Sequence, residues 1–265
     1  MSIYVSRPVT KVVTIVPTKA MRAVKLIAEV LPRLSLASQA AVRSFAPRFN
    51  GRVSAISSVP SFARPNALPA ALSATEKLQA RTLLEITSTP CLMDDAAAVR
   101  EHLKALAQAR TAAEASLSRN KVLAALTAGH HRAFLASLRQ SCAAAASEIG
   151  LTTISEEIGP LGEPRLVATD QAGRGIVAEI RSDQGSRVVL DTEIVGVKDN
   201  TCQALMERFD RALEAQGVRS GSASRKPAGG RAHLAAARAF VRKKVEGEKQ
   251  RTQRLNQRAV GRSRI

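Results

Sequence analysis

The sequence holds very few large aromatic residues, with no Trp, one Tyr and six Phe among 265 residues. Alanine supplies much of the 45% hydrophobic fraction. Because alanine buries little apolar area and aromatic side chains contribute most to core stability, we expect one small, well-packed domain with helical appendages. No stretch approaches the roughly 20 consecutive apolar residues that cross a bilayer. The sequence therefore excludes an integral membrane protein.

Cysteine is also scarce, with three residues far apart in the sequence: Cys91, Cys142 and Cys202. An odd and unclustered set argues against a disulfide framework, and no C-x-x-C pair offers zinc spacing. Cys142 and Cys202 fall on the apolar faces of predicted helices. We expect them to be small buried hydrophobic residues in a reducing compartment.

Motifs that carry catalysis are missing: the sequence has no P-loop, no G-x-S-x-G and no H-E-x-x-H. Residues 173–178 fit the loose dinucleotide pattern G-x-G-x-x-A, but strand-like alternation follows, which predicts a hairpin turn. His130 and His131 point about 100° apart on a helix and cannot chelate one metal together. They indicate a polar junction between helix and sheet or a local helix break at Gly129, and a buried site built with Asp191 or Glu193 is the alternative.

Two pairs of adjacent acids, at 94–95 and 156–157, are predicted to be a helix cap and a solvated strand edge. General acid–base catalysis needs carboxylates in differing environments that face one cleft, and adjacent residues do not provide it. We therefore expect a protein that is not an enzyme and that uses no cofactor and no metal.

Acidic residues are nearly absent from both ends of the chain. Residues 1–75 hold ten Lys/Arg and one acid. Residues 76–217 hold sixteen Lys/Arg and nineteen acids, and residues 218–265 hold fourteen Lys/Arg and two acids. The net charges are therefore +9, −3 and +12. Basic ends on a mildly acidic body indicate an anionic partner.

The N-terminal segment, residues 1–72, is predicted to be a basic arm, disordered or targeting. Its Arg, Ser, Val and Ala composition is typical of an organellar transit peptide of about 70 residues, and equally of a bacterial chain with a basic arm. Location is expected to be cytoplasmic, with mitochondrion or plastid as the alternative. Within the arm, residues 11–16 predict a short strand, residues 18–31 and 35–45 predict helices, and the prolines between 46 and 69 predict a linker.

Residues 73–120 are expected to be a helical lead-in. A Ser73–Glu76 capping box starts a helix to Ile86, and Asp94 or Asp95 caps another to about Leu117. A further helix is predicted from Asn120 to Ile149.

After Gly150 the apolar period changes from 3.6 to 2, which predicts an α+β domain at 121–217. Its fold class is a four-stranded antiparallel meander flanked by two helices on one face. The predicted strands are residues 152–158, 165–169, 175–182 and 186–197, followed by a helix from Asp199 to Gly217. In the fourth strand Val189, Asp191 and Glu193 share the face predicted to meet water.

Residues 218–265 are predicted to be a flexible basic linker and a helix from Arg231 to about Gln257, interrupted at Gly247. Lys/Arg contacts to nucleic-acid phosphates gain free energy from counterion release, whereas one aromatic residue, Phe240, is too few for base stacking. A peripheral membrane helix would need a larger apolar face. The candidate phosphate-binding residues are Arg225, Lys226, Arg231, Arg238, Arg242, Lys243, Lys244, Lys249, Arg251, Arg254 and Arg258.

The segment Glu163–Gly217 resembles small uncharacterised domains found in bacteria and encoded in plastid genomes. The matching pattern is a Gly-containing strand, a hairpin, a strand ending Glu193-Ile-Val-Gly196-Val, then Asp199-Asn-Thr-Cys202 and a helix with Phe209 and Ala212-Leu213. Some of these domains are neighbours of AAA-type ATPases, so the resemblance implies an accessory or adaptor role.

Together these patterns predict a non-enzymatic polyanion-binding protein that holds DNA or RNA phosphates through its basic C-terminal tail. The alternative is an adaptor subunit of an ATPase-containing or other assembly, with the tail on an acidic protein and an apolar helix face around Phe209 as the contact. A protein partner or a homo-oligomer is compatible with either.

Overall fold

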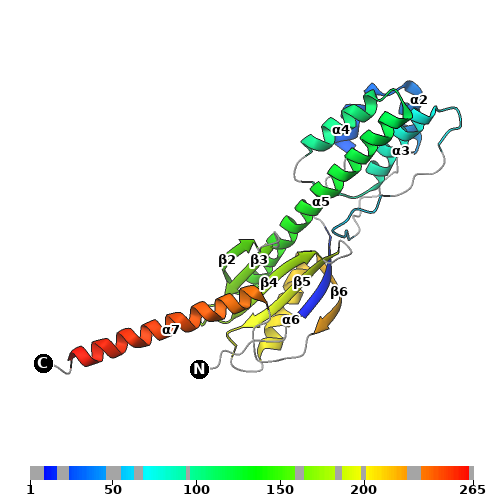
Figure 1. The fold of residues 1–265 in the computed structure, drawn as a ribbon. Helices are drawn as coiled ribbons and strands as arrows, with labels where there is room; N and C mark the ends of the chain where they lie inside the picture. The colour runs from blue at the N-terminus through cyan, green and yellow to red at the C-terminus, as the bar shows by residue number, and fades with distance from the viewer. Residues whose placement is uncertain are drawn as a thin grey trace. The chain divides into compact units, whose positions relative to one another are not determined.

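The computed structural model describes residues 9–16, 24–45, 55–62, 68–93, 96–158, 164–182, 187–197, 201–225 and 234–262. The chain divides into two compact units. The helical unit is Thr14–Leu138, and the sheet unit is Met1–Val13 together with Arg139–Ile265. Figure 1 shows the elements of each unit.

The helical unit contains α1 (Val24–Val30), a short 3-10 turn (Leu31–Arg33), α2 (Leu36–Phe45), α3 (Ala74–Ser88), α4 (Ala97–Gln108) and the first turns of α5 (Ala112–Glu148). These helices share one apolar core in which Leu83, Leu103 and Leu126 are fully buried. The predicted capping box at Ser73 is confirmed, since its hydroxyl accepts from the Glu76 N–H and the Glu76 carboxylate accepts from the Ser73 N–H.

Helix α5 corrects the prediction of a helix end at Leu117 and a new start at Asn120. It runs unbroken for 37 residues, with Asn120 inside it. The chain breaks instead after Gln108, and Thr111 and Glu114 form the start. The Thr111 hydroxyl accepts from the Glu114 N–H at 3.2 Å, while the Glu114 carboxylate accepts from the N–H of Arg110 at 2.8 Å. This reciprocal capping satisfies N–H groups that the first helical turn leaves unpaired.

The sheet unit is built on six strands, in the order β2-β3-β4-β5-β1-β6. Four of them are the predicted meander: β2 (Thr152–Ile158), β3 (Pro164–Thr169), β4 (Gly175–Ser182) and β5 (Val188–Val195). The pairs β2–β3, β3–β4, β4–β5 and β5–β1 are antiparallel. The α+β class is confirmed, and the number of four strands is wrong.

The two additional strands come from the basic ends. The short strand predicted near residue 11 exists as β1 (Val9–Ile15), but it pairs with β5 and does not belong to a separate arm. Residues 218–225, predicted to be linker, form β6 (Val218–Arg225) at the sheet edge. Its Ser- and Gly-rich sequence has low strand propensity, so the pairing surface offered by the neighbouring strand decides its conformation.

Glycines fix the turns around the meander. Gly150 and Gly217 end their helices with φ of +84° and +81°, as predicted. The pattern at 173–178 is a hairpin turn, as predicted: Gly173 lies in the turn with φ +72°, and β4 starts at Gly175. Gly196 has φ +75°, and a Cβ there would lie 2.0 Å from the Gly173 carbonyl oxygen. Only glycine fits this position.

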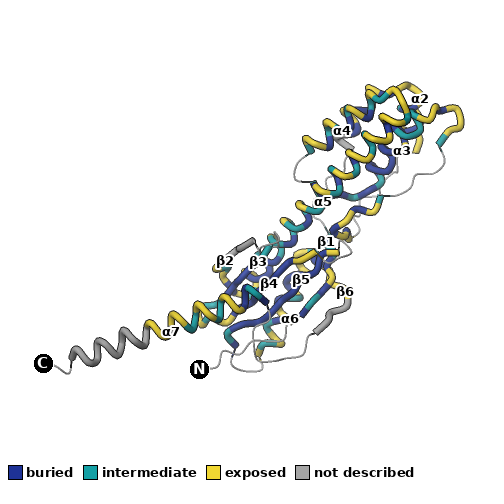
Figure 2. Tube along the Cα trace, viewed as in Figure 1, coloured by how far each residue is buried: buried dark blue, intermediate teal, exposed yellow. Residues whose placement is uncertain are grey.

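Helices cover both faces of the sheet. In Figure 1, α6 (Thr201–Ala215) and the last turns of α5 lie behind the strands, whereas α7 (Ala235–Arg262) begins in front of them. All eight residues of β5 are buried, which Figure 2 shows as a continuous dark strand. The prediction that helices cover only one face of the sheet is therefore wrong, because the first turns of α7 form a third layer.

Helix α7 extends for 28 residues and continues through Gly247, where a break was predicted. A single Gly costs about 1 kcal/mol in a helix interior, and a helix of this length retains its backbone ladder. The predicted cap at Asp199 and the helix start before Val24 lie outside the described residues. Within the described ranges, no helix combines the length and the apolar character that a bilayer crossing requires.

Candidate nucleic-acid interface

The first two turns of α7 pack on the front face of the sheet. Leu234, Ala236 and Ala237 are buried against a patch of valines on the three central strands, with Phe240 partly buried beside them. The valines are Val167, Val177 and Val195. Small alanine side chains let the helix backbone approach the strands closely, so sheet carboxylates can reach its N-terminal N–H groups.

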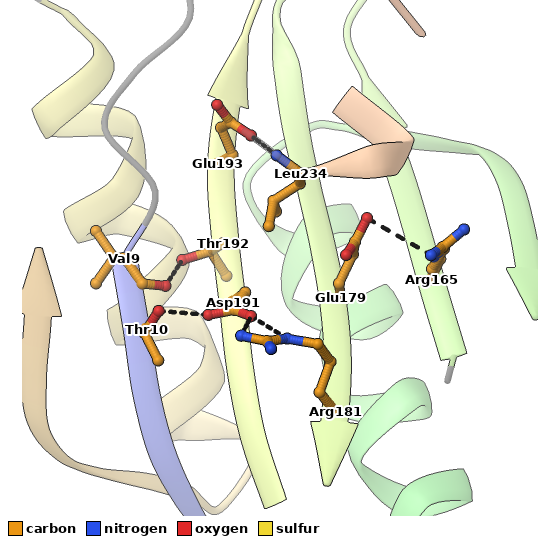
Figure 3. A network of polar contacts seen from close by, with 9 residues as sticks. All are labelled: Val9, Thr10, Arg165, Glu179, Arg181, Asp191, Thr192, Glu193 and Leu234. Carbon is orange, nitrogen blue, oxygen red and sulfur yellow. Dashed lines mark hydrogen bonds and ion pairs between the residues drawn. The ribbon is translucent and has the colours of Figure 1, made fainter. Parts of the chain in front are cut away.

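Two buried glutamates make that contact, as Figure 3 shows in part. Glu193 on β5 accepts a hydrogen bond from the Leu234 N–H at 2.8 Å, and Glu179 on β4 accepts one from the Ala236 N–H at 2.9 Å. Both glutamates are buried, Glu193 completely. Their negative charge lies at the positive end of the helix macrodipole and satisfies N–H groups that lack an intrahelical partner. The glutamates thereby anchor α7 to the sheet.

An arginine on the neighbouring strand β3 pairs with one of these two glutamates. The Nε atom of Arg165 on β3 lies 3.6 Å from the Glu179 carboxylate, which makes an ion pair rather than a hydrogen bond. Buried charges are tolerated where they are paired and hydrogen-bonded. Glu179 meets both conditions through Arg165 and the helix backbone.

A third buried acid, Asp191, holds the N-terminal strand. Its carboxylate accepts from the Thr10 hydroxyl on β1 and from Arg181 on β4, whose Nε lies at 2.5 Å. The prediction that Asp191 and Glu193 face water is therefore wrong. Strand β5 is covered on both sides, so its acids bind the two chain ends that were expected to be free arms.

Lys11, on the opposite face of the sheet, also contradicts the prediction of a free N-terminal arm. It is buried and forms an ion pair with Asp210 of α6. This N-terminal cation is part of the fold and is not available to a partner. The basic ends of the chain were predicted to carry the surplus positive charge outside the folded body. Among the described side chains of the sheet unit, this surplus lies mainly on α7.

The structure places the predicted phosphate-binding residues in three groups. Arg238, Arg242, Lys243 and Lys249 are exposed on α7. Arg225 lies in β6, and Arg251, Arg254 and Arg258 lie in α7, with side chains outside the described set, while Lys226 and Arg231 lie outside the described residues altogether. Lys244 differs: it is half-buried, and its Nζ donates to the Gly173 carbonyl at 3.4 Å.

The exposed cations form a stripe on α7. At about 100° per residue, Arg238, Arg242 and Lys249 fall within an arc of about 40°. The docked positions Phe240 and Lys244 lie roughly 140–180° away from the centre of this arc by the same geometry. Docking of α7 on the sheet therefore turns the stripe of Arg238, Arg242 and Lys249, here called the basic stripe, toward solvent. Among the described side chains, no acid forms an ion pair with it.

The histidine pair belongs to the helical unit and not to a helix–sheet junction. His130 is fully buried, accepts a hydrogen bond from the Leu92 N–H at 2.9 Å through Nδ1, and contacts the Ser57 carbonyl at 2.8 Å through Nε2. Burial is the main cause that lowers its pKa, and the charge of His131 adds to it. Asp191 and Glu193 take part in the sheet network instead, so the alternative of a histidine–acid site is wrong. Within the described residues, no three metal-binding side chains cluster.

The cysteines follow their prediction in part. Cys142 is fully buried, and burial raises its pKa to about 12. Cys91 is buried as well, with its pKa raised to about 11 by the same cause. Cys202 is half-exposed on α6, contrary to the expectation of a buried residue.

Glu179 and Glu193 were not recognised as anchors from the sequence. A signal was present in β4, whose residues 175–180 are nearly continuously apolar and small. Such a strand indicates that both faces are covered. The acids on β4 and β5 would then have to be buried, and a buried acid requires a partner.

The apolar contact expected around Phe209 is not on the surface. Phe209 is fully buried between α6 and the sheet. An adaptor role would need a different surface. Comparisons with known proteins give no match: no family model fits the chain, and neither the curated proteins nor the solved structures contain a significant relative.

Proposed function

We propose that this protein is a non-enzymatic polyanion-binding protein that holds DNA or RNA phosphates on the basic stripe of α7. The observation that carries the proposal is the orientation of α7. Its apolar and carboxylate-anchored turns face the sheet, and Arg238, Arg242 and Lys249 face solvent on the opposite side of the helix.

The length and charge of α7 support a phosphate-binding role. Its 28 residues span about 42 Å at a rise of about 1.5 Å per residue. They include nine Lys/Arg and two acids. Duplex DNA carries about one negative charge per 1.7 Å of axis, so a helix that lies along the backbone meets many phosphates.

The position of Phe240 supports contact with phosphates rather than bases. Phe240 is the single aromatic residue of α7, and it packs beside the valines of the sheet. Base stacking on exposed aromatic rings is the usual way in which single strands are held. A helix without an exposed ring contacts the backbone, which carries little sequence information.

Fluorescence anisotropy with labelled duplex DNA and duplex RNA tests this proposal. The full chain is expected to bind at 50 mM salt and to lose about a thousandfold in affinity by 200 mM if roughly six phosphates are engaged. The variant R238Q/R242Q/K249Q should bind more weakly, and the slope of log K against log salt should fall by about 2.7 for duplex DNA. Truncation after residue 250 removes five arginines, at positions 251, 254, 258, 262 and 264, and leaves the docked turns in place.

The matched control removes the same number of charges from exposed sites of the helical unit: Arg81, Arg110 and Lys121. Replacing these three by Gln should leave the affinity and the salt slope unchanged. If the control variant loses as much affinity as the stripe variant, binding follows net charge alone and the stripe has no special role. Truncation at residue 217 is uninformative because it removes β6 and uncovers Glu179 and Glu193.

A further inference from the structure

A pocket of about 470 Å³ opens in the sheet unit, between the end of α5, the β3–β4 turn and the first turns of α6. Its apolar lining includes Leu151, Val197 and Leu205, and its polar lining includes Asp170, Arg174 and Arg208. The volume lies in the range of ligand-binding pockets. None of these residues belongs to the basic stripe.

The two arginines are held in place by the surrounding fold. Arg174 donates from Nε to the Asp170 carboxylate at 2.7 Å, and its backbone N–H donates to the same carboxylate at 2.9 Å. Arg208 donates from Nη2 to the Ile149 carbonyl at 3.1 Å. Each guanidinium has five N–H donors in a planar fork, so both keep donors for a further acceptor. Each guanidinium is therefore oriented by at least one hydrogen bond before a ligand binds.

The charge of the polar group limits what it can bind. Burial raises the pKa of Asp170, but hydrogen bonds from the Arg174 N–H and guanidinium outweigh this and lower the pKa overall. Asp170 is therefore ionised at neutral pH and cancels one of the two arginine charges. A net charge of +1 matches a monoanion, whereas a phosphate dianion would leave one negative charge unbalanced beside Asp170.

We propose that this pocket binds a monocarboxylate with an apolar body. The carboxylate would accept charge-assisted hydrogen bonds from Arg174 and Arg208, since planar guanidinium groups pair with carboxylates in bidentate geometry. The apolar body would cover Leu151, Val197 and Leu205. This inference goes beyond nucleic-acid binding and is independent of it.

Isothermal titration calorimetry on the full chain tests the pocket with N-acetyl-leucine and its neutral isostere N-acetyl-leucinamide. The acid should bind at least about tenfold more tightly than the amide, because charge-assisted hydrogen bonds are stronger than hydrogen bonds between neutral groups. A short peptide that ends in leucine, with a free or an amidated carboxyl group, distinguishes a peptide end from a small acid. Tighter binding of the free peptide than of N-acetyl-leucine would assign the ligand to peptide ends within the same chemistry.

Two variants and one control place the binding in the pocket. R208Q should weaken the acid by about tenfold and leave the amide unchanged. Ala204 is exposed and lines the pocket, so A204W should block both ligands while both arginines remain. R211Q removes an exposed arginine of the same helix that is not among the lining residues, and it should change nothing.

The proposal is overturned if the acid and the amide bind equally, if neither binds, or if A204W leaves binding of the acid intact. Tighter binding of phenyl phosphate than of N-acetyl-leucine would overturn the charge assignment. Thermal melting of each variant shows whether R208Q has lost its fold, and in that case A204W decides. Nucleic-acid affinity should be the same in R208Q as in the unaltered chain, so failure of either proposal is recognised separately.

Discussion

Removal of the buried carboxylate of Glu193 should release α7 from the sheet. Glu193 is fully buried and accepts the Leu234 N–H at 2.8 Å, at the first turn of the helix. In Glu193→Ala this N–H loses a charged acceptor, which costs about 1.5–3 kcal/mol. The lost interaction with the helix macrodipole adds about 0.3–1 kcal/mol. We expect the docking of α7 to weaken by about 3 kcal/mol in total.

Hydrogen exchange measured by mass spectrometry provides the assay. A loss of about 3 kcal/mol should accelerate amide exchange in residues 235–250 by about a hundredfold, because about 1.4 kcal/mol corresponds to tenfold. Glu193→Gln keeps the shape and an acceptor oxygen while it removes the charge, so its effect should be smaller, about 1 kcal/mol. Strands β2 and β3 should exchange at nearly the same rate in both variants.

Glu214→Ala is the control, because Glu214 is an exposed acid on α6. Its effect on stability should stay below about 0.5 kcal/mol. Unchanged exchange of α7 in Glu193→Ala would refute the anchoring role of the carboxylate. The apolar contacts of Leu234, Ala236 and Ala237 alone would then have to hold α7 on the sheet and orient the basic stripe.

Three further predictions follow from single residues. Gly196→Ala should lower the free energy of unfolding, measured by urea titration, by more than about 2 kcal/mol. The residue has a positive φ, and an added Cβ would lie 2.0 Å from the Gly173 carbonyl oxygen. A stability equal to that of the unaltered chain would contradict this prediction. The pKa of His130 is lower in the folded protein than in the unfolded chain, so on acidification the unfolded chain takes up the proton first. The free energy of unfolding is therefore full above about pH 6.5 and falls below this pH by at most about 1.4 kcal/mol per pH unit. Urea midpoints measured from pH 7.5 to 5 should decline less in His130→Gln than in the unaltered chain. Burial raises the pKa of Cys91 to about 11 and that of Cys142 to about 12, so both thiols should resist iodoacetamide in the folded protein at pH 7.5. The half-exposed Cys202 should react under the same conditions. If mass spectrometry finds Cys142 modified first, the helix that buries it must open.

Local signals predicted most of the elements. The change of apolar period after Gly150 located four strands, and the Ser73–Glu76 spacing located a helix start, because both patterns arise from contacts within a few residues. The start of α5 was missed although Thr111 and Glu114 carry the same spacing. Asparagine at position 120 favours a helix cap, but inside a long packed helix tertiary contacts override that preference.

The candidate interface was predicted as a set of residues but not as a surface. Counting charges identified the basic tail, and helical spacing identified Arg238, Arg242 and Lys249 as one stripe. Which side of the helix faces solvent depends on the docking of Phe240 and its neighbours on the sheet. The tail sequence contains no information about that face until the sheet is present.

The sequence by itself determined the helices, the central strands, the turn glycines and the concentration of positive charge at the chain ends. Only the tertiary structure decided that strands from both ends join the sheet and that acids of the central strands are buried. The deciding contacts join residues 41, 57 and 181 positions apart: Leu234 with Glu193, Ala236 with Glu179, and Thr10 with Asp191. Such contacts produce no local period, and therefore the folded sheet, rather than any segment read alone, determines where α7 lies.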